Sequence, residues 1–518
     1  VQGSFNISGI YLDEGCNNIS VQDNVLLRTA DRKLFQNANG PDNTFTNNDG
    51  SSSCVIANAG LEAAYRDIRT GGAAFGPLRK HPANGRYFTD GSLRAVYLTG
   101  SHTWANLVDN GLGVGAPLSI QDPPPAFDYT AYLNLLQTNH HNFIRLWRWE
   151  LPKTFHSTGS VYFAQPHPWT RSGPGTANDG KPKFNLNQLD QSYFDRLRAR
   201  VIAARDRGIY VSIMLFEGWI FWDTVVINSQ TWKYHPFNVN NNVNGINGDA
   251  NGNGQGEETH TLQIAAVVNA QKAYVRKVID TVNDLDNVLY EVANETGVAG
   301  STEWQYDLIN YIKSYESGKA KRHPVGMTLG FIQGPGASQL WNSPADWISL
   351  GGSPYVSDPP AAPGGKVIIL DTDHTGWGVY INDVAFSRAW VWKSFTRGHN
   401  PILMEDLKGN SGWIAARAAM GHTRTYADKM NLVAMTPQNG LSTTAYCLAK
   451  VGSEYLAYQP ESGSFAVNLV AGTYALEWFN PATGAVVSSG SVNATGGNQT
   501  FTPPFSGPAV LYLKVTSP

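Results

Sequence analysis

Short apolar runs alternate with amphipathic stretches through the central part of the chain, from about Gly85 to Lys429. Helical spacing of apolar residues separates the runs, as in Phe194, Leu197 and Val201. Continuously apolar runs of this length are typical of the buried strands of a parallel sheet. They lie at Ala95–Leu98, Phe143–Leu146, Tyr210–Leu215, Val288–Val292, Val325–Thr328, Trp347–Leu350, Val367–Leu370 and Ile402–Met404. The pattern predicts an α/β fold, a (β/α)8 TIM barrel over residues 85–430.

The pattern changes on either side of this region. From Asn431 to Pro518 helical spacing is lost, and short strand-like segments alternate with turn signals, which predicts an antiparallel β-sandwich as an accessory domain. Residues 1–70 repeat short β-like pieces rich in Asn and Asp, as the coils of a right-handed parallel β-helix do. A solenoid needs about three repeats to be stable, so we interpret this segment as a β-helix-like remnant.

The composition limits the partners and the location that the protein can have. A net charge of −3 with 15% charged residues argues against a nucleic-acid partner, and no apolar run is long enough to span a membrane. Abundant Gly, Asn, Thr and Ser favour a secreted, extracellular protein whose signal peptide has been removed, since the first residues do not resemble one. We expect a monomer.

The three cysteines predict no metal site. None has the C-x-x-C spacing of a zinc ligand pair, and we expect neither a metal nor a cofactor. Cys16 and Cys54 either form a disulfide or remain two unpaired residues. Cys447 lies in an apolar alternation and is predicted to be buried and inert.

The predicted strand ends carry the candidate chemistry, because function in such barrels lies at the carboxyl ends of the strands. Carboxylates, tryptophans and other polar residues gather there: His102, Trp104, Arg145, Trp147, Trp149, Glu217, Trp219, Asn294, Glu295, Asp373, His374 and Glu405. Four of the eight ends carry a carboxylate, which favours acid–base chemistry.

These motifs resemble clan A of the glycoside hydrolases, with a family 5-like barrel. The resemblance rests on FIRLW around Arg145, on VLYEVANE with Asn294 and Glu295, and on the acid after the seventh strand. Segments such as SPADWIS and ILDTDH resemble a branch whose C-terminal domain is named for collagen binding. The resemblance covers the barrel and the sandwich. It implies that Glu295 is the general acid/base and that a carboxylate ending the seventh strand is the nucleophile.

Glu295 suits this role because a protonated carboxyl beside a glycosidic oxygen makes it a better leaving group. Asn294 suits a bond to the sugar 2-OH, and Arg145 would keep the nucleophile ionised. Counting eight strands makes Asp373 the nucleophile, where the clan usually has Glu. If Trp347–Leu350 is not a barrel strand, Glu405 takes that place; otherwise Glu405 binds substrate.

The remaining candidates are predicted to bind the sugar. His102, His374 and Glu217 would bond hydroxyls. Trp104, Trp147, Trp149, Trp219 and Trp377 would stack on sugar rings, although at least half of these tryptophans are expected in the core or the barrel wall.

The segment Asn238–His260 contains the start of an EF-hand pattern, Asp249-x-Asn251-x-Asn253-Gly254. Its twelfth position is His260 where a bidentate Glu is required. We therefore interpret the segment as a flexible loop beside the cleft.

Together these observations predict a retaining glycoside hydrolase that cleaves β-linked polysaccharide or oligosaccharide of the cellulose, mannan or xylan type. The alternative is a non-catalytic carbohydrate- or matrix-binding protein on a barrel scaffold.

Overall fold

The computed structural model describes residues 74–110, 121–155, 161–221 and 232–517, together with four short N-terminal strands. The chain divides into two units, the first formed by residues 1–72 and 91–93 and the second by residues 73–90 and 94–518. Cys16 and Cys54 lie outside the described residues.

The first unit contains two parallel strand pairs. Strand β1 (Ile10–Leu12) pairs with β3 (Leu34–Gln36), and β2 (Ser20–Gln22) pairs with β4 (Thr44–Thr46). In both pairs the partner residue lies 24 positions further along the chain, Ile10 with Leu34 and Ser20 with Thr44. A constant parallel offset is compatible with successive coils of a solenoid, and the β-helix interpretation stays a prediction.

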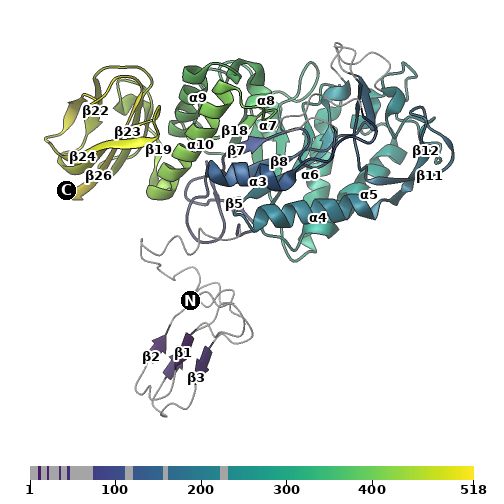
Figure 1. The fold of residues 1–518 in the computed structure, drawn as a ribbon, viewed down its shortest axis with the longest axis horizontal. Helices are drawn as coiled ribbons and strands as arrows, with labels where there is room; N and C mark the ends of the chain where they lie inside the picture. Colours follow the sequence, from purple (N-terminus) through teal and green to yellow (C-terminus); the bar gives the residue numbers. More distant parts are fainter. Residues whose placement is uncertain are drawn as a thin grey trace. The chain divides into compact units, whose positions relative to one another are not determined.

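The second unit is built on an eight-stranded sheet that forms a TIM barrel (Figure 1). In chain order its strands are β7 (Gly100–His102), β8 (Phe143–Leu146), β13 (Tyr210–Glu217), β14 (Val288–Asn294), β15 (Val325–Thr328), β16 (Trp347–Ser349), β17 (Val367–Asp371) and β18 (Asn400–Met404). Each paired neighbour is parallel. Between β7 and β8, Asn142 closes the ring, because its backbone and side-chain amides bond Thr99 O and Tyr97 O.

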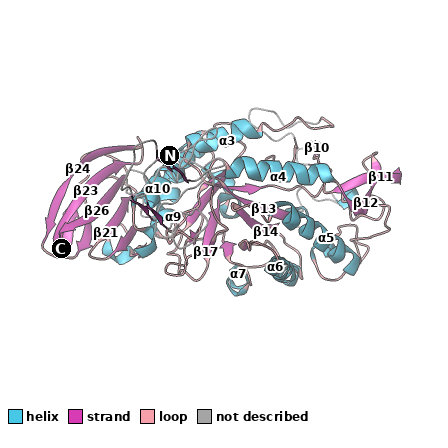
Figure 2. Cartoon of the chain, turned by 90° about the horizontal axis from the view of Figure 1, so that it is seen from below, coloured by secondary structure: helices cyan, strands magenta, loops and turns pink. Residues whose placement is uncertain are grey.

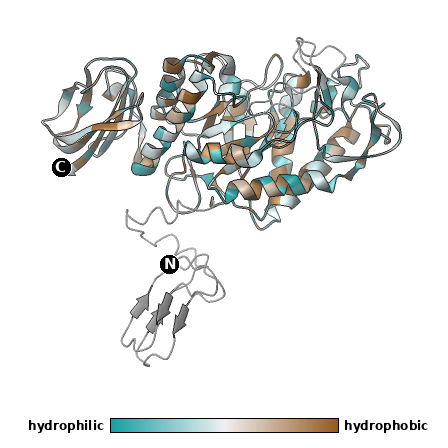
Figure 3. Ribbon diagram, viewed as in Figure 1, coloured by the Kyte–Doolittle hydropathy of each residue, from teal (hydrophilic) through white to brown (hydrophobic). Residues whose placement is uncertain are grey.

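Helices cover the outside of the barrel. They are α3 (Tyr129–Thr138), α4 (Gln191–Arg205), α5 (Ala265–Val282), α6 (Ser301–Ser317), α7 (Ala337–Asn342), α9 (Val384–Thr396) and α10 (Ser411–Lys429), with the short α8 (Thr372–Thr375) after β17. Figure 3 shows apolar and polar residues alternating around α4 and α5. Phe194, Leu197 and Val201 form the buried stripe of α4, as their spacing predicts. None of the described helices combines the length and apolar character that crossing a bilayer requires.

The first barrel strand differs from the prediction. Val96 forms only an isolated bridge with Phe88, and the barrel strand is Gly100–His102. These polar residues are buried because the fold supplies their hydrogen bonds: Tyr132 donates to Ser101 O at 2.7 Å, and Ser101 N donates to His141 at 3.2 Å. A polar strand of this kind gives no apolar signal. The other seven predicted runs overlap barrel strands, and β16 is the sixth of them.

Smaller elements extend the loops. Two-stranded antiparallel pairs are formed by β5 (Arg79–Lys80) with β6 (Phe88–Thr89), β9 (Lys153–Phe155) with β10 (Val161–Phe163), and β11 (Trp169–Thr176) with β12 (Pro182–Leu189). Short 3-10 helices lie at Trp219–Phe221, Trp232–Tyr234, Glu257–His260, Trp377–Tyr380, Leu432–Ala434 and Asn439–Leu441.

The C-terminal region is an antiparallel sandwich, as predicted. A six-stranded sheet has the order β19-β20-β21-β26-β23-β24, and β22 pairs with β25. Figure 2 shows β21, β26, β23 and β24 side by side. The strands are β19 (Thr436–Pro437), β20 (Cys447–Lys450), β21 (Glu454–Gln459), β22 (Phe465–Leu469), β23 (Gly472–Asn480), β24 (Ala485–Ala494), β25 (Gly497–Phe501) and β26 (Ala509–Ser517). Cys447 is fully buried in this core, and burial raises the pKa of its thiol to about 12.

An aromatic cluster joins the sandwich to the barrel. Trp392 of α9 stacks on Tyr458 of β21 with ring centroids 6.0 Å apart and contacts Phe479 of β23 at 5.8 Å. Tyr426 of α10 contacts Phe479 at 5.4 Å and Tyr512 of β26 at 5.9 Å. The outer face of the six-stranded sheet is thus buried against α9 and α10.

Replacing Trp392 with Ala is expected to lower the free energy of unfolding by about 3–5 kcal/mol, the usual cost of truncating a buried tryptophan. The measurement is chemical denaturation followed by circular dichroism. Val486→Ala on the exposed strand β24 is the control and should change stability by less than about 0.5 kcal/mol. Equal stability of Trp392→Ala and the parent would mean that the two parts do not support each other.

Candidate active site

Three barrel strands bring charged residues together at their carboxyl ends. Arg145 lies on β8, Asn294 ends β14 with Glu295 following, and Asp371 ends β17. Asp373 lies two residues further, in α8. All the strands are parallel, so these ends share one rim of the barrel.

Arg145 is the buried centre of this group. Its Nε donates to Glu291 at 2.8 Å, Nη1 to Asp371 at 2.7 Å and Nη2 to Asn294 Oδ1 at 2.7 Å. Burial lowers the pKa of Arg145, but the charges of Glu291 and Asp371 outweigh this effect and raise it. The guanidinium is therefore a permanent cation that ties β8, β14 and β17 together.

Asp371 is the ionised partner of this cation. Burial opposes its ionisation, but His102 and then Arg145 hold the pKa of Asp371 below its usual range. His102 Nε2 lies 2.9 Å from Asp371 Oδ2. Asp371 and Glu291 are both fully buried. Neither residue was predicted from the sequence, although Glu291 lies inside an apolar strand, where a buried carboxylate requires a partner.

Glu295 and Asp373 differ from these residues because both keep partial solvent exposure. One carboxylate oxygen of each, with a ring nitrogen of His374, lie within 4.8 Å of one another. The backbone of Glu295 has φ +46°, a strained conformation for a non-glycine residue that often marks functional positions. Glu295 and Asp373 are thus a close, accessible pair of acids.

Both acids bind protons more tightly than an exposed carboxyl does. Burial and then the charge of Asp371 raise the pKa of Asp373 to about 7. Burial and then the charge of Asp373 raise the pKa of Glu295 well above its usual range. Arg145 Nη1 lies 3.5 Å from Asp373 Oδ2 and favours its ionised form. Asp373 is therefore the member of the pair that ionises first.

His374 is neutral and fixed. Burial lowers its pKa to about 3, and its Nδ1 lies 2.8 Å from Ser349 Oγ. Its Nε2 lies 3.3 Å from Asn294 Oδ1. The cluster with Glu295 and Asp373 has ligand atoms of the kind that bind metals, but both ring nitrogens of His374 already have protein partners. This arrangement favours proton chemistry over metal binding.

Glu217 is a third buried acid at this rim. Its Oε1 accepts from Trp219 N at 3.2 Å, and its Oε2 is buried without a hydrogen-bond partner among the described residues. Burial raises the pKa of Glu217 well above its usual range. Glu150, which the sequence analysis also missed, accepts from Glu217 N at 2.7 Å and bonds His235 and His260, each at 3.1 Å.

The predicted tryptophans divide into wall and rim residues. Trp147 is 1% and Trp149 is 8% exposed, so both belong to the barrel wall. Trp104 and Trp219 are half-buried, and Trp219 contacts Trp149 edge to face at 6.0 Å. The side chain of Trp377 lies outside the described residues.

Glu405 follows the eighth strand. Its Oε2 bonds Arg417 of α10, and burial raises its pKa. Because β16 is a barrel strand, the condition under which Glu405 would follow the seventh strand is not met.

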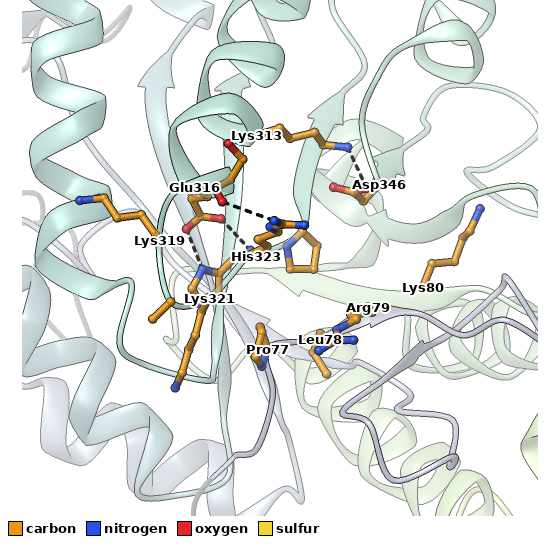
Figure 4. Close-up of a pocket in the computed structure, with 14 residues that line it drawn as sticks. Pro77, Leu78, Arg79, Lys80, Lys313, Glu316, Lys319, Lys321, His323 and Asp346 are labelled. Carbon is orange, nitrogen blue, oxygen red and sulfur yellow. Dashed lines mark hydrogen bonds and ion pairs between the residues drawn. The ribbon is translucent and has the colours of Figure 1, made fainter. Parts of the chain in front are cut away.

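A hollow of about 700 Å³ lies at the opposite end of the barrel (Figure 4). His323 and Asp346, which line it, immediately precede β15 and β16. Two ion pairs lie within its lining: Lys313 bonds Asp346 at 2.8 Å, and His323 bonds Glu316 at 2.8 Å. Such features at the amino ends of barrel strands serve stability.

Comparisons with known proteins agree with this architecture. The family model "Putative collagen-binding domain of a collagenase" matches residues 431–510. No curated protein sequence matches the chain. A crystal structure of a glycoside hydrolase family 5 protein from Bacteroides vulgatus ATCC 8482 superposes with a TM-score of 0.53 at 12% identity, covering 86% of this chain and 95% of that one.

A second crystal structure from the same organism, described as a putative glycoside hydrolase, also has a TM-score of 0.53 at 12% identity. It covers 85% of this chain and 82% of that chain. At this identity the likeness shows that the chain shares the fold of these glycoside hydrolases.

The raised pKa of Asp373 predicts a pH-dependent cost in stability. The folded protein holds this proton more tightly than the unfolded chain, so the stability it provides is present below about pH 4 and is lost as the pH rises through about 7. Asp373→Asn should therefore raise the melting temperature at pH 8 by about 2 °C or more, and raise it distinctly less at pH 5, where only part of the effect is present.

The control is Glu461→Gln, an exposed residue of the sandwich, which should leave the melting temperature unchanged at both pH values. A lower melting temperature of Asp373→Asn at pH 8 would contradict the burial effect on Asp373.

Proposed function

We propose that the chain is a retaining glycoside hydrolase acting on a β-linked polysaccharide or oligosaccharide of the cellulose, mannan or xylan type. The observation that carries the proposal is the close pair of accessible acids, with oxygens of Glu295 and Asp373 within 4.8 Å. Retaining enzymes hold their carboxyl groups about 5–5.5 Å apart, whereas inverting enzymes need about 6.5–9.5 Å.

Asp373 is the nucleophile in this mechanism. Its carboxylate forms a bond to the anomeric carbon while the bond from that carbon to the leaving oxygen breaks. Glu295 gives its proton to the leaving oxygen. In the second step Glu295 takes a proton from water, whose oxygen replaces Asp373 on the anomeric carbon. The two environments fit these roles, since Arg145 favours an ionised Asp373 and burial keeps Glu295 protonated.

Surrounding residues would hold the sugar. Asn294 Oδ1 is engaged by Arg145 and His374, so its amide N–H groups are the part available to a sugar hydroxyl. Glu217, when protonated, can donate a hydrogen bond to a second hydroxyl. The half-buried rings of Trp104 and Trp219 suit stacking on sugar faces.

The second candidate is a non-catalytic carbohydrate- or matrix-binding protein, which the family match of residues 431–510 favours. One observation speaks against this candidate: one face of the sandwich already packs on α9 and α10 and cannot also bind a partner. Product release from a panel of polysaccharides and aryl glycosides separates the two, because a binding protein releases nothing.

Glu295→Gln should abolish hydrolysis of natural glycans, by about 10²-fold or more, because the amide cannot protonate the leaving oxygen. Aryl glycosides with good leaving groups need little acid assistance and should be cleaved at a much larger fraction of the parent rate. The two rates are measured side by side, with circular dichroism to verify the fold. An equal loss on both substrates would argue against the acid/base role.

Asp373→Ala should stop turnover and be partly rescued by azide, which enters the vacated space and attacks the anomeric carbon. The matched variant is Glu405→Ala, which removes another buried rim acid and should show no azide rescue. The pH profile of the parent should rise through about pH 7 as the Asp373–Glu295 pair loses its first proton.

NMR of the first-formed anomer completes this test, and an inverted product would overturn the retaining mechanism. Rescue of Glu405→Ala alone would make Glu405 the nucleophile.

A further inference from the structure

The loop that follows the third barrel strand folds around its own asparagine and aspartate side chains. Gly254 N donates to Asp249 Oδ2 at 2.9 Å, Asn253 N to Asn251 Oδ1 at 2.8 Å, and Gln255 N to Asn253 Oδ1 at 2.9 Å. Gly254 has φ +77°. The sharp turn at a glycine in the sixth position is the turn that an EF-hand calcium loop requires.

Three carboxylate oxygens in this loop are buried without a hydrogen-bond partner among the described residues: Asp249 Oδ1, Glu257 Oε2 and Glu258 Oε2. Glu258 is only 5% exposed, and its other oxygen accepts from Asn251 N at 3.2 Å, so its carboxylate lies inside the loop. Among the described ion pairs, none brings a lysine, arginine or histidine to these three acids. Burying anionic oxygens without a counter-charge raises the free energy of the folded protein, so a bound cation would stabilise this loop.

The geometry points to a Ca²⁺ site in residues 249–258, with Asp249, Glu257 and Glu258 as carboxylate ligands. Ca²⁺ takes six to eight oxygen ligands, among them side chains at loop positions 1, 3 and 5 and a carbonyl at position 7. Counting from Asp249, these positions are Asn251, Asn253 and Gln255, and Glu257 is the ninth.

The missing twelfth ligand has a structural explanation. His260 occupies that position, and it turns away from the loop, because its Nε2 bonds Glu150 at 3.1 Å and its ring stacks on Trp304 at 4.4 Å. Glu258, in the tenth position, brings a buried carboxylate back into the loop instead. The flexible loop predicted from the sequence thus has an ordered interior.

Some adjustment accompanies ion binding. Glu257 Oε1 accepts bonds from the side-chain amides of Asn251 at 3.1 Å and Asn253 at 2.6 Å. Among the described residues, the Glu295 cluster alone has its ligand atoms within 4.8 Å, so the loop acids must approach one another. Asp249 and Glu257 are half-buried, so neither side chain is fully enclosed by the protein.

The site also bears on the rim of the barrel. His260 and His235 hold Glu150, which in turn accepts from the backbone of Glu217. A Ca²⁺ ion bound by Glu258 would lie close to His260, two residues further along the chain. It would hold in place the segment that supports the end of the third barrel strand.

The test is calorimetric titration of the full chain, freed of metal by a chelator, with calcium chloride. We expect one equivalent bound with a Kd between about 10⁻⁷ and 10⁻³ M, weaker binding of Mg²⁺, and a rise in melting temperature with Ca²⁺. Absence of binding heat and of any shift in melting temperature in the folded protein would overturn the proposal.

Glu258→Gln separates a ligand from a merely structural residue. In chelator it should be at least as stable as the parent, because it removes an uncompensated charge. With Ca²⁺ it should bind at least tenfold more weakly and lose the thermal shift. Equal destabilisation with and without Ca²⁺, or unchanged Ca²⁺ affinity, would contradict a ligand role.

Two further variants complete the design. Asp249→Asn should weaken Ca²⁺ binding in the same way and serves if Glu258→Gln does not fold. Glu295→Gln, in the acid cluster, should leave Ca²⁺ affinity unchanged. Loss of binding in Glu295→Gln alone would place the ion at the rim instead and overturn the loop site.

Discussion

The structure of the rim depends on one buried guanidinium. Arg145 bonds side chains from β14 and β17 while it lies on β8, so a single side chain sets the spacing of three strand ends. Burying a cation is tolerable only when anions and hydrogen bonds compensate it, and Glu291 and Asp371 supply both. Asn294 and Asp373 take their places around this cluster, because Asn294 bonds Arg145 at 2.7 Å and Asp373 lies 3.5 Å from it.

The same cluster divides the acids into two kinds. Asp371 and Glu291 are fully buried, and their carboxylates accept hydrogen bonds from Arg145. Burial and then the charge of Asp371 raise the pKa of Asp373, and burial and then the charge of Asp373 raise the pKa of Glu295, so both acids hold protons at higher pH. Asp371 and Asp373 lie only two residues apart, yet their environments move their pKa values in opposite directions.

Much of the barrel could be predicted from the sequence, because buried parallel strands must be apolar and are therefore visible as runs. Strand β7 was missed for the opposite reason: its residues Gly100–His102 are polar and owe their burial to hydrogen bonds from distant positions. Glu295, Asp373 and Arg145 were found because they lie at or just beyond strand ends. The role of Asp371 could not be predicted, because it depends on a contact across the barrel with a residue 226 positions away.

The packing of the sandwich on α9 and α10 has a consequence for how this part of the chain could be engineered. The sandwich has its own core, which includes Cys447 and Trp478, and so has the form of a transferable module. Its opposite face carries Tyr458, Phe479 and Tyr512, which an isolated module would leave in water. Grafting it onto another protein would therefore also require matching aromatic side chains on the host. The sandwich and the barrel are therefore expected to unfold together, as one cooperative unit.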